Sequence, residues 1–246
     1  LATLLTVTGC AADAELDTMN PQGPLAQEID NLLQPVLILA YVIFAMVLGV
    51  TLVIWWKFRD NHEDEEFPKQ VHGNTKLELL WTAAPTIILA VLSVFTLIVL
   101  ASLNDREDNA ISIQVDGETV TWEPEVVVVG QQWWWEFRYY LHGLDGVDLS
   151  DARNLPPADI VTSSQMIIPI GQEIELSATS RDVIHSFWVP RLAGKIDCIP
   201  NRENHLWFQA DEVGTWYGQC AEFCGSQHAK MLIRVISEKE VDFNSW

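Results

Sequence analysis

The stretch that decides the fold reads Cys220-Ala-Glu-Phe-Cys224-Gly-Ser-Gln-His228-Ala-Lys-Met231. Short runs rich in β-branched and aromatic residues flank it on both sides, which is typical of β-strands. Thiolate, imidazole and thioether groups are the ligands that soft transition-metal ions prefer. The stretch therefore predicts a metal-binding loop between two strands of a β-domain.

Cys224, His228 and Met231 alone have the spacing of a loop that binds a single copper ion. Such blue-copper sites use two histidines, one cysteine and a weak axial thioether, so a second histidine must come from another part of the chain. His185 is the candidate, because it lies at one end of a predicted strand in the run Val-Ile-His185-Ser-Phe-Trp-Val. We therefore expect His185 to reach the loop.

Cys220 adds a second thiolate to this loop and changes the predicted number of ions. Two anionic sulfurs can bridge two copper ions, each of which then takes one histidine. Met231 can be the weak ligand of one ion, and a backbone carbonyl, most simply that of Glu222, the weak ligand of the other. The alternatives are a Cys220–Cys224 disulfide and a zinc site with two cysteines and two histidines. We favour copper because Met231 suits it and because a disulfide leaves both histidines without a purpose.

Further short runs before the loop also have the composition of strands. Residues 132–140 alternate, so one face of a single strand is expected to carry Trp133, Trp135, Phe137 and Tyr139. This spacing of strands and turns predicts a Greek-key sandwich or barrel over 104–246. The predicted strands are 126–129, 132–140, 165–170, 173–178, 184–189, 205–210, 214–218 and 231–236.

Two runs in the first part of the chain, 32–56 and 79–103, carry no formal charge. Each is longer than the roughly 20 residues that a helix needs to cross about 30 Å of hydrocarbon. We therefore expect a transmembrane helix hairpin over 32–103, with helices at about 32–57 and 77–103.

The positions of lysine and arginine predict how this hairpin is oriented. Residues 1–31 contain neither, whereas the segment between the two apolar runs contains Lys57, Arg59, Lys69 and Lys76. Both termini are therefore expected on the outer, periplasmic side of a bacterial inner membrane. Residues 1–9 look like the remnant of a signal peptide, and Val7-Thr-Gly-Cys10 resembles a lipobox. We expect a lipid anchor on Cys10, at the start of an external segment over 10–31.

The chain is acidic, with a formal net charge of −20 at pH 7. Such a charge disfavours nucleic acid as a partner. An acidic outer face instead attracts a basic protein and speeds the encounter with it. Solubility alone would account for the same charge, and the two roles are compatible.

The ligand pattern resembles that of a known family, subunit II of cytochrome c oxidase, and the resemblance extends over about 32–237. It implies a cupredoxin-like Greek-key domain with a binuclear copper centre. It also implies that the backbone carbonyl of Glu222 is a copper ligand and that its carboxylate binds a Mg²⁺ ion shared with subunit I. The implied partners are subunit I and other oxidase subunits, the membrane, and a soluble or membrane-bound cytochrome c. The matching residues are His185, Cys220, Glu222, Cys224, His228 and Met231.

Two further residues gain a role only through this resemblance. Trp133, in Gln-Gln-Trp133-Trp-Trp, matches the tryptophan at which the family accepts electrons, although a packed strand tryptophan is the alternative. Glu78, in Glu78-Leu-Leu-Trp-Thr-Ala-Ala-Pro, matches a carboxylate at the inner opening of a proton pathway in subunit I, although a merely solvated carboxylate is the alternative.

Arg181 stands where the family often has an acid, and Cys198 is expected to be a buried free thiol.

The resemblance implies an electron relay rather than a complete catalyst. As a subunit of a cytochrome c oxidase, the chain would accept electrons from cytochrome c at the copper pair and pass them to haem in subunit I. There O₂ would be reduced to water, coupled to proton pumping. The alternatives are the copper-bearing subunit of a nitric oxide reductase and a membrane-tethered copper-binding protein. A quinol oxidase subunit II lacks the copper ligands that are present in this chain.

Overall fold

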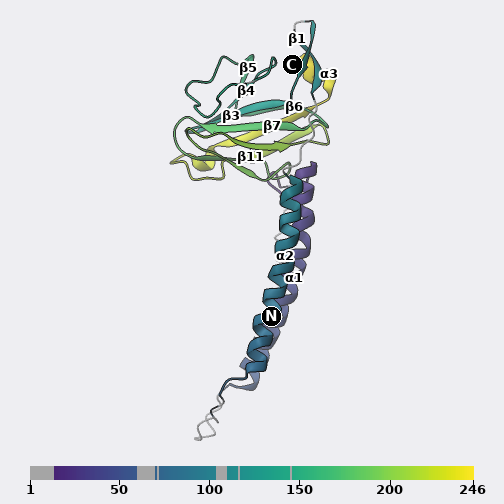
Figure 1. Ribbon diagram of the computed structural model, residues 1–246, viewed down its shortest axis with the longest axis vertical. Coiled ribbons are helices and arrows are strands. Elements are labelled where there is room, and N and C mark those ends of the chain that lie inside the picture. The colour runs from purple at the N-terminus through teal and green to yellow at the C-terminus, as the bar shows by residue number, and fades with distance from the viewer. Residues whose placement is uncertain (1–13, 60–69, 71, 104–109, 116, 145) are drawn as a thin grey trace, which may run out of the picture. The chain divides into compact units, whose positions relative to one another are not determined.

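The computed structural model describes residues 14–59, 70, 72–103, 110–115, 117–144 and 146–246. The chain divides into two compact units, one formed by Leu1–Asp30 with Asp105–Trp246 and the other by Asn31–Asn104. Two long helices dominate the second unit, and a β-domain dominates the first (Figure 1). Cys10 and most of the linker between the helices lie outside the described residues, so the lipid anchor stays a prediction.

The first helix, α1 (Pro24–Lys57), is long and apolar enough to cross a membrane. It begins at Pro24, before the predicted start at 32, and proline suits this position because its fixed φ matches the first helical turn. Leu25 and Ala26 are buried, and the Ala26 N–H donates to the Leu192 carbonyl at 3.2 Å. The first turn of α1 therefore packs on the β-domain, a contact between distant parts of the chain.

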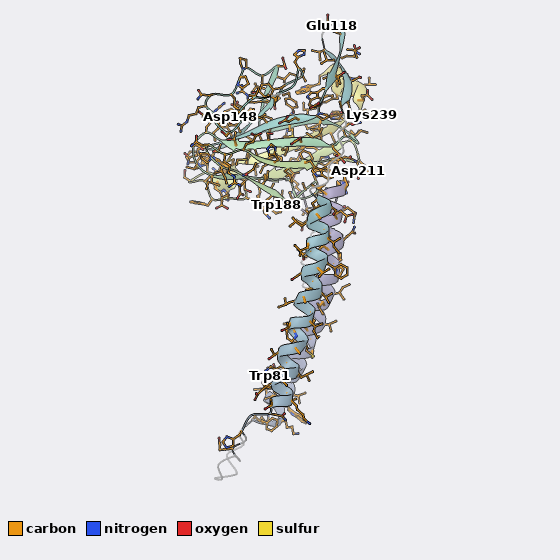
Figure 2. All side chains as sticks on the ribbon, in the orientation of Figure 1. Trp81, Glu118, Asp148, Trp188, Asp211 and Lys239 are labelled. Atoms are coloured by element: carbon orange, nitrogen blue, oxygen red, sulfur yellow. The ribbon has the colours of Figure 1, made fainter. Side chains whose placement is uncertain are left out.

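The second helix, α2 (Thr75–Leu103), is also long and apolar enough to span a membrane. Asn74 caps its start, because its side-chain oxygen accepts hydrogen bonds from the backbone N–H groups of Lys76 and Leu77 at 3.1 and 3.3 Å. Trp81 projects from the first turns of α2 (Figure 2), where an exposed tryptophan suits a membrane interface.

The β-domain contains two larger sheets and two short ribbons. The five-stranded sheet has the order β10-β7-β3-β4-β5, and the three-stranded sheet has the order β11-β12-β6. β3 pairs in parallel with β7, and β12 in parallel with β6, while the other ladders are antiparallel. The two helices followed by this β-domain confirm the predicted fold class. The remaining elements are β1 (Ile111–Val115), β2 (Glu118–Trp122), β3 (Glu125–Gln131), β4 (Trp134–Tyr139), β5 (Ile160–Ser163), β6 (Gln165–Pro169), β7 (Ile174–Ser180), β8 (His185–Trp188), β9 (Lys195–Cys198), β10 (Asn204–Phe208), β11 (Gly214–Gln219), η1 (His228–Lys230), β12 (Leu232–Glu238) and α3 (Glu240–Ser245).

The predicted single strand over 132–140 is wrong at its start. β3 ends at Gln131 and pairs there with Trp134, the first residue of β4, so Gln132 and Trp133 form the turn between the two strands. Trp135 and Phe137 are fully buried on one face, as the alternation predicted. Trp133 is not on that face, because it belongs to the turn.

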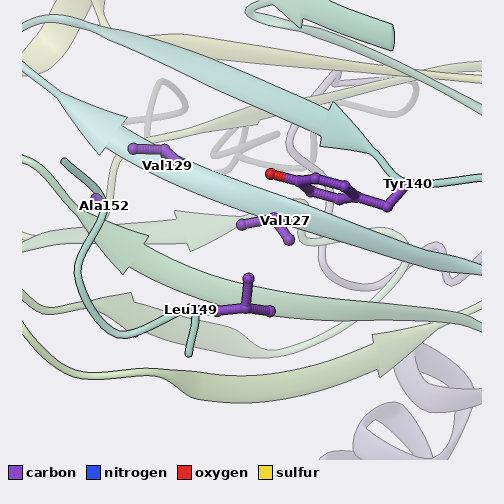
Figure 3. Close-up of a cluster of buried hydrophobic side chains, with 5 residues drawn as sticks. All are labelled: Val127, Val129, Tyr140, Leu149 and Ala152. Atoms are coloured by element: carbon purple, nitrogen blue, oxygen red, sulfur yellow. The ribbon is translucent and has the colours of Figure 1, made fainter. Parts of the chain in front are cut away.

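Strand β3 lies at the centre of the larger sheet and is buried on both faces. Val127 and Val129 face a small cluster with Tyr140, Leu149 and Ala152 (Figure 3). Fully buried strands typically read as unbroken β-branched runs of this kind. The long connection between β4 and β5 therefore covers the sheet and packs on β3, the strand that leads into the β3–β4 turn.

Candidate metal centre

The predicted metal loop connects β11 to β12. The last pair of this ladder joins Gln219 to Leu232, and the Cys220 N–H donates to the Met231 carbonyl at 3.0 Å. The two ends of the motif therefore start from neighbouring strands. The short helix η1 returns the chain toward the cysteines and carries His228.

His185 is the first residue of β8, and its side chain is fully buried. Gly130 at the end of β3 makes room for it, because a Cβ on Gly130 would lie 2.8 Å from His185 Cδ2. Trp135 packs edge-on against the imidazole, with ring centroids 6.0 Å apart. Asp182 Oδ1 lies 2.8 Å from Nε2, so Nδ1 is directed to Cys220. A carboxylate on the outer nitrogen of a histidine ligand is a common way to fix its tautomer.

The two thiols of the loop lie at the centre of the site, with their sulfurs 3.8 Å apart. On one side, His185 Nδ1 lies 3.9 Å from Cys220 Sγ. On the other side, His228 Nδ1 and Met231 Sδ lie 3.6 and 3.8 Å from Cys224 Sγ. The structure thus brings all five predicted side-chain ligands together.

Glu222 completes this arrangement on the side of Cys220. Its backbone carbonyl oxygen lies 3.2 Å from Cys220 Sγ, while its side chain is exposed. Cys198, Cys220 and Cys224 are buried free thiols, as expected for Cys198, so the structure does not contain the alternative disulfide.

The acid–base properties of the two thiols differ. Burial raises the pKa of the Cys220 thiol, but hydrogen bonds with His185, with backbone groups and with His228 together outweigh burial and hold this pKa below its ordinary value. Burial and the negative charge of Cys220 raise the pKa of Cys224. Partial burial also raises the pKa of Asp182, but hydrogen bonds from His185 and from backbone N–H groups together outweigh burial. The pKa of Asp182 therefore lies below its ordinary value. An anionic sulfur beside a fixed imidazole is a ready ligand for a soft cation.

The donor set fits copper better than zinc. His185, Cys220 and Cys224 place their ligand atoms within 4.8 Å of one another, and these residues are buried. A structural zinc site uses four nitrogen or sulfur ligands in a tetrahedron and leaves the Met231 thioether unused. Two central thiols, one imidazole on each side and a weak ligand on each side match a pair of soft ions.

A buried ion network lies beside the site on β4. Glu136 is 5% exposed and forms ion pairs with Arg138 and Arg181 at 2.7 Å each. Burial raises the pKa of Glu136, but the two guanidinium groups outweigh burial and hold it below its ordinary value. Arg181 also donates to the Gln131 side chain at 3.2 Å. Arg181, which stands where an acid is common in the resembling family, therefore joins β4 to the last residue of β3.

The other predicted residues lie in different places. The Trp133 indole N–H donates to the Cys224 carbonyl at 3.1 Å, so Trp133 contacts the metal loop. Glu78 is exposed in the first turn of α2, in the helical unit. Sequence analysis missed Gln132, whose side chain also donates to the Cys224 carbonyl, and the role of Gly130. The glycine that follows the valine run, at position 130, was the one available signal.

Comparisons with known proteins agree with this geometry. The profile described as "Cytochrome C oxidase subunit II, periplasmic domain" matches residues 125–238, and "Cytochrome C oxidase subunit II, transmembrane domain" matches 12–99. Cytochrome c oxidase subunit 2 of Alkalihalophilus pseudofirmus is 35% identical over 98% of this chain, which spans 64% of that protein's length. A probable cytochrome c oxidase subunit 2 of Rickettsia bellii is 30% identical, with 92% of this chain and 80% of that protein covered.

One solved structure is also similar in sequence to part of this chain. The periplasmic domain of subunit II of cytochrome oxidase of Bradyrhizobium japonicum is 32% identical, with a TM-score of 0.40, and covers 50% of this chain and 90% of its own. The two family profiles and the Rickettsia relative carry the assignment, because they cover both the helices and the β-domain. The chain belongs to the cytochrome c oxidase subunit II family.

Proposed function

We propose that this chain accepts electrons from cytochrome c at a binuclear copper centre and passes them to haem in subunit I of a haem–copper oxidase. The observation that carries the proposal is the pair of buried thiols 3.8 Å apart, with one imidazole on each side. A copper pair bound by two shared thiolates takes up and releases one electron with little change in geometry. Reduction of O₂ and proton pumping belong to the partner subunit in this proposal.

Each ligand has a separate task. Cys220 and Cys224 would hold both ions, and His185 and His228 would each hold one of them. Asp182 keeps the Nδ1 lone pair of His185 directed inward through its contact with Nε2 at 2.8 Å. Met231 and the Glu222 carbonyl, on opposite sides of the thiol pair, are the weak ligands.

The surroundings of four of the five side-chain ligands exclude water, and His228 is half-buried. His185, Cys220, Cys224 and Met231 are each at most 3% exposed. Rigid, buried ligands change little when a charge arrives, because few dipoles around them can reorient. Such burial favours an electron relay over a copper chaperone, whose ligands must exchange metal with a partner.

Trp133 is the proposed point of electron uptake. It lies half-buried in the β3–β4 turn, and its indole N–H contacts the carbonyl of the ligand residue Cys224. A donor protein at the surface therefore reaches the copper loop through one aromatic ring and one hydrogen bond. The acidic chain, with a net charge of −20, favours a basic cytochrome c as that donor.

Two carboxylates are proposed to serve subunit I. The exposed side chain of Glu222 belongs to the residue whose carbonyl contacts Cys220, so it suits a Mg²⁺ ion shared with that subunit. Glu78 begins the second span and is proposed to lie at the inner opening of a proton pathway. We further propose that both termini face the periplasm of a bacterial inner membrane and that Cys10 carries a lipid.

Purification of the tagged chain with its partners from native membranes tests this function. We expect a haem-bearing subunit in the complex and O₂ consumption driven by reduced cytochrome c. Reduction of nitric oxide without O₂ consumption would identify the alternative reductase. A copper-containing chain that purifies without any haem protein would favour a membrane-tethered copper-binding protein and would contradict the proposal.

A further inference from the structure

Gln132 is not a proposed metal ligand, but it forms hydrogen bonds with residues of the metal site. Its side-chain Nε2 donates to the Cys224 carbonyl at 2.7 Å, and the Trp133 indole N–H donates to the same oxygen at 3.1 Å. One carbonyl of the metal loop thus accepts hydrogen bonds from two adjacent side chains of the β3–β4 turn. The Gln132 bond is the shorter of the two.

The turn sits directly on the loop at this point. Gly225, which follows Cys224, has a φ of +122°, and a Cβ there would lie 3.1 Å from Gln132 Nε2 and 3.1 Å from Trp133 Nε1. Few residues other than glycine adopt such a backbone conformation. Gly225 therefore allows both side chains to approach the Cys224 carbonyl.

The backbone of Gln132 is tied to the other half of the site. Its N–H donates to Asp182 Oδ2 at 2.7 Å, and Asp182 Oδ1 contacts His185 Nε2 at 2.8 Å. Gln132 is therefore connected through Asp182 to the segment that carries His185 and, through its own side chain, to the loop that carries both cysteines.

The neighbouring Gln131 has different hydrogen-bond partners from Gln132. Gln131 accepts a hydrogen bond from Arg181 at 3.2 Å, and its amide nitrogen lies 3.4 Å from Glu136. Both contacts point to the ion network on β4 and none of them to the metal loop. Gln131 is therefore a control of the same residue type, in the adjacent position at the end of β3.

We propose that Gln132 is a positioning residue for electron uptake, which holds the Trp133 indole against the Cys224 carbonyl. This inference rests on the proposed role of Trp133. Without the Gln132 amide, the contact between the turn and the loop depends on the single longer bond from the indole. Loss of one net hydrogen bond reduces the population of the contact geometry about fivefold.

The first test needs no copper and no donor. The reduced, copper-free full-length chain is labelled with 5-fluorotryptophan, and Trp133→Phe identifies the ¹⁹F resonance of Trp133. Gln132→Ala and Gln132→Glu should shift or broaden this resonance, because both remove the amide donor, whereas Gln131→Ala should leave it in place. An unchanged resonance in both Gln132 variants would overturn the proposal.

The second test measures one-electron transfer from reduced cytochrome c to the copper-loaded full-length chain. At saturating donor, both Gln132 variants should slow electron transfer about fivefold with unchanged copper content. Gln132→Glu should not raise the half-saturating concentration, because an added acid strengthens docking of a basic donor.

The outcomes separate the inference from the function on which it rests. A normal rate at saturation with a raised half-saturating concentration would make Gln132 a docking residue only and would overturn the proposal. If Trp133→Ala slows transfer and the Gln132 variants do not, only the inference on Gln132 fails. If Trp133→Ala itself transfers electrons normally, the proposed uptake at Trp133 fails, and the inference fails with it.

Discussion

Gly130 is not a proposed metal ligand, but Gly130→Ala should disturb the metal site through His185. The added Cβ would lie 2.8 Å from His185 Cδ2 and 3.0 Å from His185 Cβ and Cγ, closer than two carbons approach without displacement. The imidazole has little freedom to retreat, because Asp182 holds its Nε2 at 2.8 Å and the Trp135 ring packs edge-on against it. The ring must therefore shift, and Nδ1 must shift with it.

The size of the effect follows from this crowding. Overpacking of a well-packed core costs about 1–3 kcal/mol. For a protein of about 150–250 residues, each kcal/mol lowers the melting temperature by about 2–4 °C. We therefore expect the copper-free Gly130→Ala protein to melt about 2–12 °C below the parent. Copper bound on the side of His185 should be lost at free copper concentrations at which the parent stays fully loaded.

Thermal unfolding of the purified full-length chain and copper analysis at controlled free copper measure both effects. Val127→Ala is the matched control, because Val127 is a fully buried residue of the same strand that packs on the cluster with Leu149, away from His185. It should lower the melting temperature without loss of copper. A Gly130→Ala protein that melts and binds copper like the parent would refute the account of how His185 is held. Equal copper loss in Val127→Ala would assign the effect to general destabilisation.

Three further predictions concern the thiol pair, the ion network and electron uptake. Cys220→Ser should reduce copper to one ion or none per chain, and retention of two ions would contradict bridging. Glu136→Gln should destabilise the protein at pH 7 by about 1–3 kcal/mol, because it removes the buried carboxylate that pairs with two partly buried guanidinium groups. Glu212→Gln, at an exposed position, should not. Since the folded-state pKa of Glu136 is lowered, the difference in unfolding free energy between Glu136→Gln and the parent should shrink as the pH falls below about 4.3. A difference that does not change with pH in urea unfolding would count against this role of the Glu136 carboxylate. Trp133→Ala should slow electron transfer from cytochrome c and spare copper content, and an unchanged rate in stopped-flow mixing would remove Trp133 from the path.

The metal loop was predictable because its ligands are close together in the sequence. Cys220, Cys224, His228 and Met231 lie in one connection between two strands, so their chemistry and spacing indicate a shared site. His185 was identified from its residue type and its place by a strand, and the structure places its Nδ1 3.9 Å from Cys220 Sγ. Alternation also predicted the buried face of Trp135 and Phe137.

Features that depend on contacts between distant residues were not predictable. The alternation of 132–140 continues through the β3–β4 turn, so the pattern hides the break at Gln132 and Trp133. Gln132 meets the Cys224 carbonyl across 92 positions of the sequence, and its residue type gives no signal for that contact. The early start of α1 likewise depends on packing of Leu25 and Ala26 against the β-domain, which hydropathy cannot show.

The most direct test of the central claim is the electron paramagnetic resonance spectrum of the copper-loaded, full-length chain, recorded together with its copper content. Two thiolates that share two copper ions should give two ions per chain. The unpaired electron is then spread equally over two copper nuclei and should produce a seven-line hyperfine pattern. One ion per chain with a four-line pattern would place the electron on a single copper and would contradict the binuclear centre.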